Sequence, residues 1–154
     1  DVCSSDLIFD SDNYDSLLKV AYENCALLLH SAINLIINKK VKRIKQDQIS
    51  KHGLYCSKRI EGDEIINWNN SSREIFNFIR ALTLPGPCAK TYLNKSLVKI
   101  ISAEEIQNAP NYIGIPGIIL TKNKENFYVK TSDSYLKVTK WSSKVNLKVG
   151  SRLL

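Results

Sequence analysis

Residues 66–87 read INWNNSSREIFNFIRALTLPGP, and the organisation of the whole chain follows from this stretch. Ser71 can accept a hydrogen bond from the amide of Glu74, whose side chain can reach back to residue 71; this reciprocal pair caps a helix at its N-terminus. Apolar side chains then recur on one helical face, namely Ile75, Phe78, Ile79 and Leu82. Pro85-Gly86-Pro87 ends the helix, because proline lacks an amide proton and disfavours helix in the residue before it. The stretch predicts a short helix over Ser72–Leu82.

The chain after Pro87 has the composition of β-strands. Short runs rich in Tyr, Val, Ile and Thr alternate with turn residues such as Asn94-Lys95 and Ser132-Asp133. The predicted strands are Ala89–Leu93, Leu97–Ala103, Gly117–Thr121, Phe127–Thr131 and Tyr135–Thr139. Strands this short and this closely spaced favour a small barrel over a sandwich.

Upstream, one long helix is predicted from Tyr14 to Asn38. Apolar residues recur there at steps of three and four, which indicates a single packing stripe: Leu17, Leu18, Ala21, Tyr22, Cys25, Leu28, Leu29, Ala32, Ile33, Ile36 and Ile37. Asp12 or Asn13 can cap the first free amides. Because His30, Ser31 and Asn34 interrupt the most apolar run, we expect no membrane span.

Charge is unevenly distributed along the chain. The net charge is −5 over residues 1–38, +7 over 39–59, −2 over 60–85 and +7 over 86–154. Residues 39–64 also lack helical periodicity and are interpreted as a linker. Clustered Lys and Arg either bind a polyanion or form a solvated basic surface, and composition leaves both open.

Cys3, Cys25, Cys56 and Cys88 lie far apart in sequence, and the chain has only two histidines. We therefore expect reduced thiols and no metal site. The chain contains no methionine, so we expect its start to be truncated. Residues 1–7 match the translation of a common sequencing-adapter oligonucleotide and are interpreted as a non-native scar.

The stretch quoted first resembles the domain junction of folate-dependent formyltransferases, and among them the methionyl-tRNA formyltransferases. That junction reads Ile-Asp-Trp, two residues, Ser, three residues, Ile, three residues, Ile-Arg-Ala and a Pro/Gly-rich turn. This chain follows the pattern, with Asn67 in place of the aspartate. The resemblance implies the last helix region of an N-terminal catalytic domain at residues 8–40, a linker at 41–66 and an OB-like C-terminal domain at 67–154. The implied fold is mixed α and β, ending in a small OB-like β-barrel.

The family's chemistry uses an Asn, a His and an Asp that position and deprotonate an amine attacking 10-formyltetrahydrofolate. These residues lie upstream of the long helix in the family, and none maps onto this chain. The resemblance therefore implies a cytoplasmic parent enzyme, the folate bound outside this chain, and no formyl transfer by the chain itself. Asp10, Asp12 and Asp15 are interpreted as acids at a helix start rather than as a catalytic base.

If the parent acts on tRNA, its linker would contact phosphates, and the predicted RNA-binding residues are Lys42, Arg43, Lys45, Lys58 and Arg59. Three further residues are assigned to the junction. Ser71 caps the helix, Trp68 anchors the linker on the domain rather than stacking on substrate, and Arg80 pins the junction through bidentate hydrogen bonds rather than touching ligand.

Two other functions stay open. Residues 83–88 depart from the Asn-Pro-Trp-Pro-Gly-Ala form of tRNA-acting members, and Lys58-Arg59 with Glu61-Gly62-Asp63 is similar to members that formylate amino sugars on nucleotides. A nucleotide sugar is therefore an alternative substrate. The third possibility is a free-standing OB-like module that binds single-stranded nucleic acid through aromatic platforms: Tyr92, Phe127, Tyr128 and Tyr135.

Overall fold

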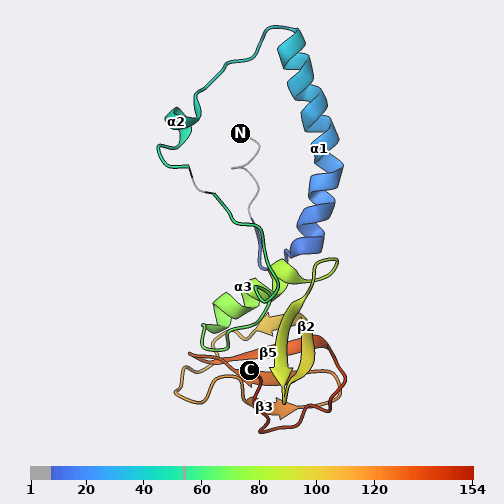
Figure 1. Ribbon diagram of the computed structural model, residues 1–154, viewed down its shortest axis with the longest axis vertical. Helices are drawn as coiled ribbons and strands as arrows, with labels where there is room; N and C mark the ends of the chain where they lie inside the picture. Colours follow the sequence, from blue (N-terminus) through green and yellow to red (C-terminus); the bar gives the residue numbers. More distant parts are fainter. Residues whose placement is uncertain (1–7, 54) are drawn as a thin grey trace. The chain divides into compact units, whose positions relative to one another are not determined.

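The computed structural model describes residues 8–53 and 55–154 (Figure 1). Its elements are α1 (Tyr14–Ile37), α2 (Gln46–Ile49), α3 (Ser72–Leu82), β1 (Ala89–Leu93), β2 (Ser96–Glu105), β3 (Ile119–Lys122), β4 (Phe127–Lys130) and β5 (Tyr135–Ser143). The chain divides into two compact units. We call residues 17–63 the helix–linker unit, and residues 8–16 with 64–154 the barrel unit. Residues 1–7, the predicted scar, lie outside the described residues.

The barrel unit is built on one antiparallel sheet with the strand order β1-β2-β5-β4-β3. Inward side chains of the strands form its core and are fully buried, including Val98, Ile100, Ile119, Phe127, Val129, Leu136 and Val138. The apolar face of α3 joins the same core through Ile75, Ile79 and Leu82. The mixed α and β fold predicted from the sequence is confirmed.

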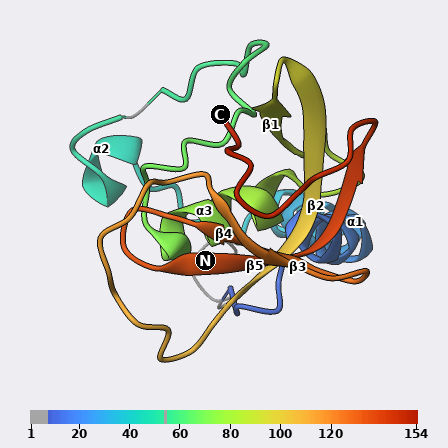
Figure 2. The same cartoon turned by 90° about the horizontal axis from the view of Figure 1, so that it is seen from below.

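The C-terminal tail closes the sheet into a barrel. On one side the Ile119 amide donates to the Ser151 carbonyl at 2.9 Å, and on the other Tyr92 and Leu154 exchange both backbone hydrogen bonds at 2.9 Å. Residues 151–154 therefore lie between β3 and β1, the two edges of the sheet, and Figure 2 shows the tail running beside β1. Gly117 permits this closure: its φ is +85°, and a Cβ there would lie 2.3 Å from the Leu153 carbonyl oxygen.

A short segment before α3 also joins the barrel unit. The Lys90 amide donates to the Glu64 carbonyl and the Ile66 amide donates to the Lys90 carbonyl, both at 2.8 Å. The compact unit therefore resumes at Glu64, whereas the resemblance placed the end of the linker at residue 66.

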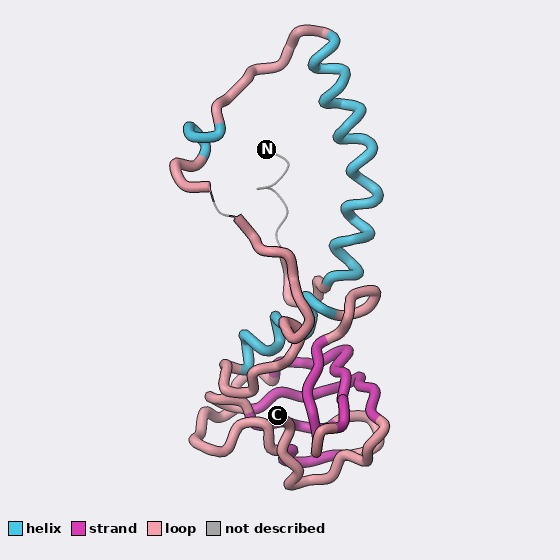
Figure 3. The backbone as a smooth tube through the Cα atoms, viewed as in Figure 1, coloured by secondary structure: helices cyan, strands magenta, loops and turns pink. Residues whose placement is uncertain are grey.

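In the helix–linker unit, α1 has no buried residue, and Tyr22 and Ile37 are 74% and 70% exposed. By length and apolar composition alone, α1 is the one helix among the described residues that could cross a membrane. It does not by itself indicate a membrane protein, because the core helix of a soluble protein passes the same test. Apart from α2, residues 38–53 and 55–63 are loop (Figure 3), where the sequence predicted a linker without a helix.

Candidate functional site

The start of α3 carries the predicted reciprocal cap. The Glu74 amide donates to Ser71 Oγ at 3.2 Å, and the Ser71 amide donates to Glu74 Oε2 at 2.9 Å. The Ser71 hydrogen bonds, from its side chain and its backbone, lower the pKa of the Glu74 carboxyl group. The cap fixes where the helix begins, and therefore where its two arginines lie.

Asp133 ties the start of α3 to the turn between β4 and β5. Its Oδ1 accepts hydrogen bonds from the Ser72 amide at 2.9 Å, Thr131 Oγ1 at 2.9 Å and the Ser134 amide at 2.8 Å. Burial opposes ionisation of this carboxyl group, but these hydrogen bonds outweigh it and lower its pKa to about 2. From the sequence alone, Asp133 was identified only as a turn residue.

Trp68 lies at the junction with its indole ring buried, at 4% exposure. Its Nε1 donates to Thr91 Oγ1 at 3.0 Å, and the Thr91 hydroxyl in turn donates to the Leu154 carbonyl at 2.9 Å. One side chain thus connects the segment before α3, strand β1 and the closing tail. The ring is packed as an anchor and presents no open face on which a base could stack.

Two arginines of α3 hold the segment that precedes α1. Arg80 Nη1 donates to the carbonyl oxygens of Phe9 at 2.6 Å and Asp12 at 3.0 Å. Arg73 forms ion pairs with Asp10 at 2.5 Å and Glu105 at 3.0 Å. The Arg73 guanidinium lowers the pKa of Asp10.

These contacts assign roles that sequence reasoning missed. Arg73 was not singled out, and Asp10, interpreted as an acid at a helix start, instead pairs with Arg73. The α1 cap comes from Asn13, whose Oδ1 accepts from the Ser16 amide at 3.1 Å. A pocket of about 130 Å³ between residues 10–13 and α3 is smaller than a typical ligand site.

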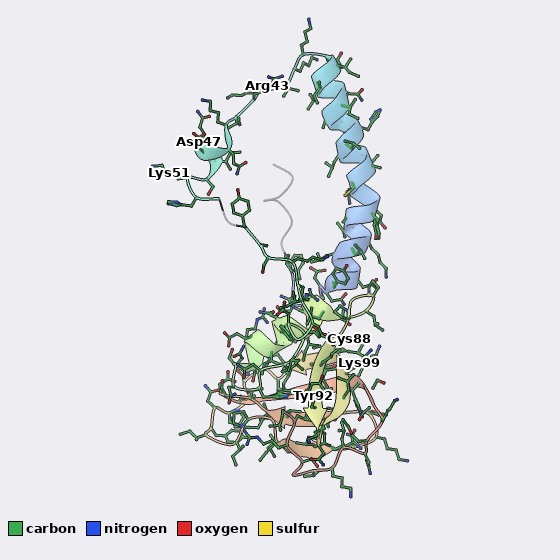
Figure 4. The ribbon with its side chains drawn as sticks, viewed as in Figure 1. Arg43, Asp47, Lys51, Cys88, Tyr92 and Lys99 are labelled. Atoms are coloured by element: carbon green, nitrogen blue, oxygen red, sulfur yellow. The ribbon has the colours of Figure 1, made fainter. Side chains whose placement is uncertain are left out.

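The predicted RNA-binding residues Lys42, Arg43, Lys45, Lys58 and Arg59 are all exposed, on loops of the helix–linker unit. Figure 4 labels Arg43 there, with Asp47 and Lys51. None of the five predicted residues forms an ion pair with an acidic residue of the described ranges 8–53 and 55–154. These five cations are therefore available to bind phosphate groups or to remain solvated.

The proposed aromatic platform is only partly available. Phe127 is fully buried and packs edge-on against Trp141 with 4.9 Å between ring centroids, so including it among stacking residues was wrong. Its burial follows from strand alternation, which turns it into the core. Tyr128 and Tyr135 contact each other edge-on at 5.9 Å.

The described part of the chain holds no group of three or more His, Cys, Asp or Glu side chains placed to bind a metal ion. Cys25 and Cys56 are exposed free thiols and Cys88 is a buried one. Cys3 lies outside the described residues.

Comparison with known proteins places the chain in a family. Residues 60–149 match the family described as formyl transferase, C-terminal domain. The methionyl-tRNA formyltransferase of Mycoplasma mycoides subsp. mycoides SC is 38% identical over 134 residues, which cover 84% of this chain and 40% of that protein. The enzyme of the same name from Syntrophomonas wolfei is 32% identical over 130 residues, with the same coverage of 84% and 40%.

A variant of HypX from Aquifex aeolicus has a similar fold, with a TM-score of 0.53 and 17% sequence identity over 82% of this chain and 21% of that one. The chain spans about 40% of the length of the curated relatives named above. The family match extends over more than half of the 154 residues and contains α3 and all five strands. The resemblance expected from residues 66–87 is confirmed, and the chain belongs to the family of formyl transferase C-terminal domains.

Proposed function

We propose that this chain is the C-terminal part of a cytoplasmic, 10-formyltetrahydrofolate-dependent formyltransferase that acts on methionyl-tRNA. The observation that carries the proposal is the identity of 38% and 32% over 84% of the chain to proteins named methionyl-tRNA formyltransferase. Within this function the chain would bind RNA, while the formyl transfer takes place on a part of the enzyme outside it.

The folate donor does not fit the pockets beside α3. One has a volume of only about 130 Å³. The other, of about 580 Å³, is lined by Asp10, Glu104 and Glu105 and by no Lys or Arg, so it offers no cation to bind the carboxylates that a folate carries. We therefore assign no step of the reaction to a folate held by these residues.

The linker cations supply the RNA contact in this proposal. Eight cations and one acidic residue, Asp47, lie between residues 39 and 59. A cation within about 8 Å of a phosphate, one Debye length at physiological salt, releases counterions on binding and makes affinity fall as salt rises. The exposed Lys42, Arg43 and Lys45 belong to the densest part of this cluster, residues 39–45.

The test measures binding of the chain to bulk tRNA by fluorescence anisotropy over a range of salt concentrations. Replacing Lys42, Arg43 and Lys45 by Ala should weaken binding and reduce the salt slope by about one for each phosphate-binding cation removed. A matched variant with Lys122, Lys124 and Lys148 replaced by Ala removes the same charge from the barrel unit and should change the slope less. Undetectable or salt-insensitive binding at low salt would favour a small phosphorylated substrate instead.

A nucleotide amino sugar was the alternative suggested by the unusual turn at residues 83–88. In the structure Thr83 Oγ1 donates to the Ile101 carbonyl at 2.8 Å, and Cys88 is buried. Both ends of this turn thus pack against the rest of the protein. The difference between the sequence of residues 83–88 and that of tRNA-acting members therefore has a structural explanation. We favour tRNA as the substrate for this reason.

A further inference from the structure

The segment before α1 belongs to the barrel unit, although residues 17–63 separate it from the rest of that unit in the sequence. The family match begins at residue 60, so the segment lies outside the matched C-terminal domain. The similarity to the curated relatives covers 84% of the chain, which is more than residues 60–154 alone could supply. In the proposed enzyme, the part upstream of this chain therefore meets the barrel at residues 8–13.

Residues 9–12 form a turn that is held by its own hydrogen bonds. The Asp12 amide donates to the Phe9 carbonyl at 3.0 Å, and the Phe9 amide donates to Asp12 Oδ2 at 2.8 Å. The other carboxylate oxygen of Asp12 accepts from the Ser16 hydroxyl at 3.1 Å, which connects the turn to the first turn of α1. The turn and the start of α1 are thus one locally ordered piece.

Arg80 holds both ends of this turn. Its Nη1 donates to the carbonyls of Phe9 and Asp12 at 2.6 Å and 3.0 Å, two acceptors that are adjacent only when the turn is formed. On the α3 side its Nε donates to Asn77 Oδ1 at 3.0 Å, and the guanidinium lies over the Phe76 ring, 5.4 Å from the ring centroid. The planar group is therefore oriented by α3 itself, so it can define the position of the turn.

Arg73 adds a second point of attachment. Its two terminal nitrogens donate to the two carboxylate oxygens of Asp10, at 2.9 Å and 2.5 Å, and its guanidinium lies over the same Phe76 ring at 5.5 Å. The side chains of Arg73 and Asp10 are 45% and 66% exposed, and ion pairs this exposed contribute little to stability. Two separate attachments fix the orientation of a segment as well as its place, so geometry is the main effect of the pair.

From this geometry we infer that Arg80 and Arg73 are positioning residues for formyl transfer. They hold residues 9–12 on the barrel and so fix the entry of the upstream catalytic part, which must meet the aminoacyl end of a tRNA bound by the same chain. Neither arginine touches the substrate in this role. Reacting groups must be aligned closely, and a misplacement of about 1 Å that arises far from the chemistry can cost on the order of a hundredfold in rate. The inference rests on the proposed function.

The test measures steady-state formylation of methionyl-tRNA by the complete parent enzyme, and tRNA affinity by fluorescence anisotropy. Arg80→Gln should lower kcat/KM by about ten- to a hundredfold, mainly through kcat, while the Kd for tRNA changes by less than about twofold. Arg80→Lys should not restore activity, because its ammonium is one bond shorter and lacks the Nε donor to Asn77. Lys124→Gln is the matched control, since it removes one exposed positive charge elsewhere on the barrel unit and should leave both quantities unchanged.

The ion pair gives a second comparison that separates positioning from contact with RNA. Arg73→Gln and Asp10→Asn should each lower kcat/KM, and the double variant should be no slower than the slower single variant, because both changes break one interaction. If Arg73 only attracted RNA, Asp10→Asn would instead strengthen tRNA binding by removing a negative charge. In the 154-residue chain, hydrogen exchange of the Asp12 amide should be faster in Arg80→Gln than in the wild type, with exchange in β4 unchanged.

Full activity of Arg80→Lys, or opposite effects of Arg73→Gln and Asp10→Asn, would overturn the inference. Unchanged exchange of the Asp12 amide in Arg80→Gln would also overturn it, even if the parent formylates methionyl-tRNA. A lowered thermal midpoint of Arg80→Gln would leave the inference dependent on Asp10→Asn, which alters an exposed side chain and must still reduce kcat. If the wild-type parent transfers no formyl group to methionyl-tRNA, the proposed function falls and the catalytic role of the two arginines falls with it.

Discussion

Replacing Asp133 by Asn tests how the barrel holds the start of α3. The pKa of this carboxyl group falls from about 4 in an unfolded chain to about 2 in the folded protein. If the whole of this pKa shift were coupled to folding, the ionised carboxylate would stabilise the folded protein by about 2.5 kcal/mol. Because the side chain is only half-buried, screening by solvent reduces this to about 1 to 1.5 kcal/mol.

The sign of the effect follows from the direction of the shift. A carboxyl group whose pKa is depressed by folding stabilises the protein above its unfolded pKa, and this contribution is lost as pH falls from about 5 toward 2. At pH 7 the free energy of unfolding of Asp133→Asn should therefore lie about 1 to 1.5 kcal/mol below that of the wild type. The two values should converge as pH approaches 2.

Urea denaturation at several pH values between 7 and about 3, followed by far-UV circular dichroism, measures this difference. Glu125→Gln is the control, because the Glu125 side chain accepts no hydrogen bond and forms no ion pair within residues 8–53 and 55–154. Asp133→Ala should be less stable than Asp133→Asn at every pH, since it leaves the amides of Ser72 and Ser134 without their acceptor. A difference between wild type and Asp133→Asn that stays constant with pH would refute the reasoning.

Three further predictions concern the junction, the long helix and the chemistry. Trp68→Ala should lower the free energy of unfolding by about 3 kcal/mol, and Trp68→Phe by about 1 kcal/mol for the missing indole donor; an unchanged denaturation midpoint would show that the ring is not buried in solution. The chain should self-associate in analytical ultracentrifugation as concentration rises, because α1 exposes apolar residues such as Tyr22 and Ile37; a monodisperse monomer at high concentration would contradict this. The chain alone should transfer no formyl group from 10-formyltetrahydrofolate to methionyl-tRNA, and detectable turnover would overturn the assignment of catalysis outside it.

Signals within a few residues were sufficient to predict those elements whose ends are set by neighbouring residues. The Ser71–Glu74 cap and the Pro85-Gly86-Pro87 stop predicted α3 over the same residues that the structure shows. The run Ala89–Leu93 likewise matches β1. Here a cap, a stop or an alternating pattern within a few residues decides the conformation, so no knowledge of the partner is needed.

Features that depend on distant partners were not predictable in the same way. The strand β5 was expected to end at Thr139 and continues to Ser143, because its polar end pairs with Val98–Ile100 of β2. The pairing of Arg73 with Asp10 joins residues 63 positions apart, and an exposed arginine on a helix gives no hint of its partner. In the sequence Asp133 is an ordinary turn residue, and only the fold places its carboxylate where it accepts a hydrogen bond from the Ser72 amide.

The tail that lies between β1 and β3 also constrains the order in which the barrel can form during synthesis. Neither edge of the sheet is fully paired until residues 151–154 have left the ribosome, because these residues carry the partners of Tyr92 and Ile119, while the earlier segment at Glu64 and Ile66 pairs only with Lys90 of β1. Until then both edges expose unpaired backbone groups, which can pair with another nascent chain. A pause in translation just before residue 151 would therefore prolong the interval in which the barrel is open and prone to aggregation.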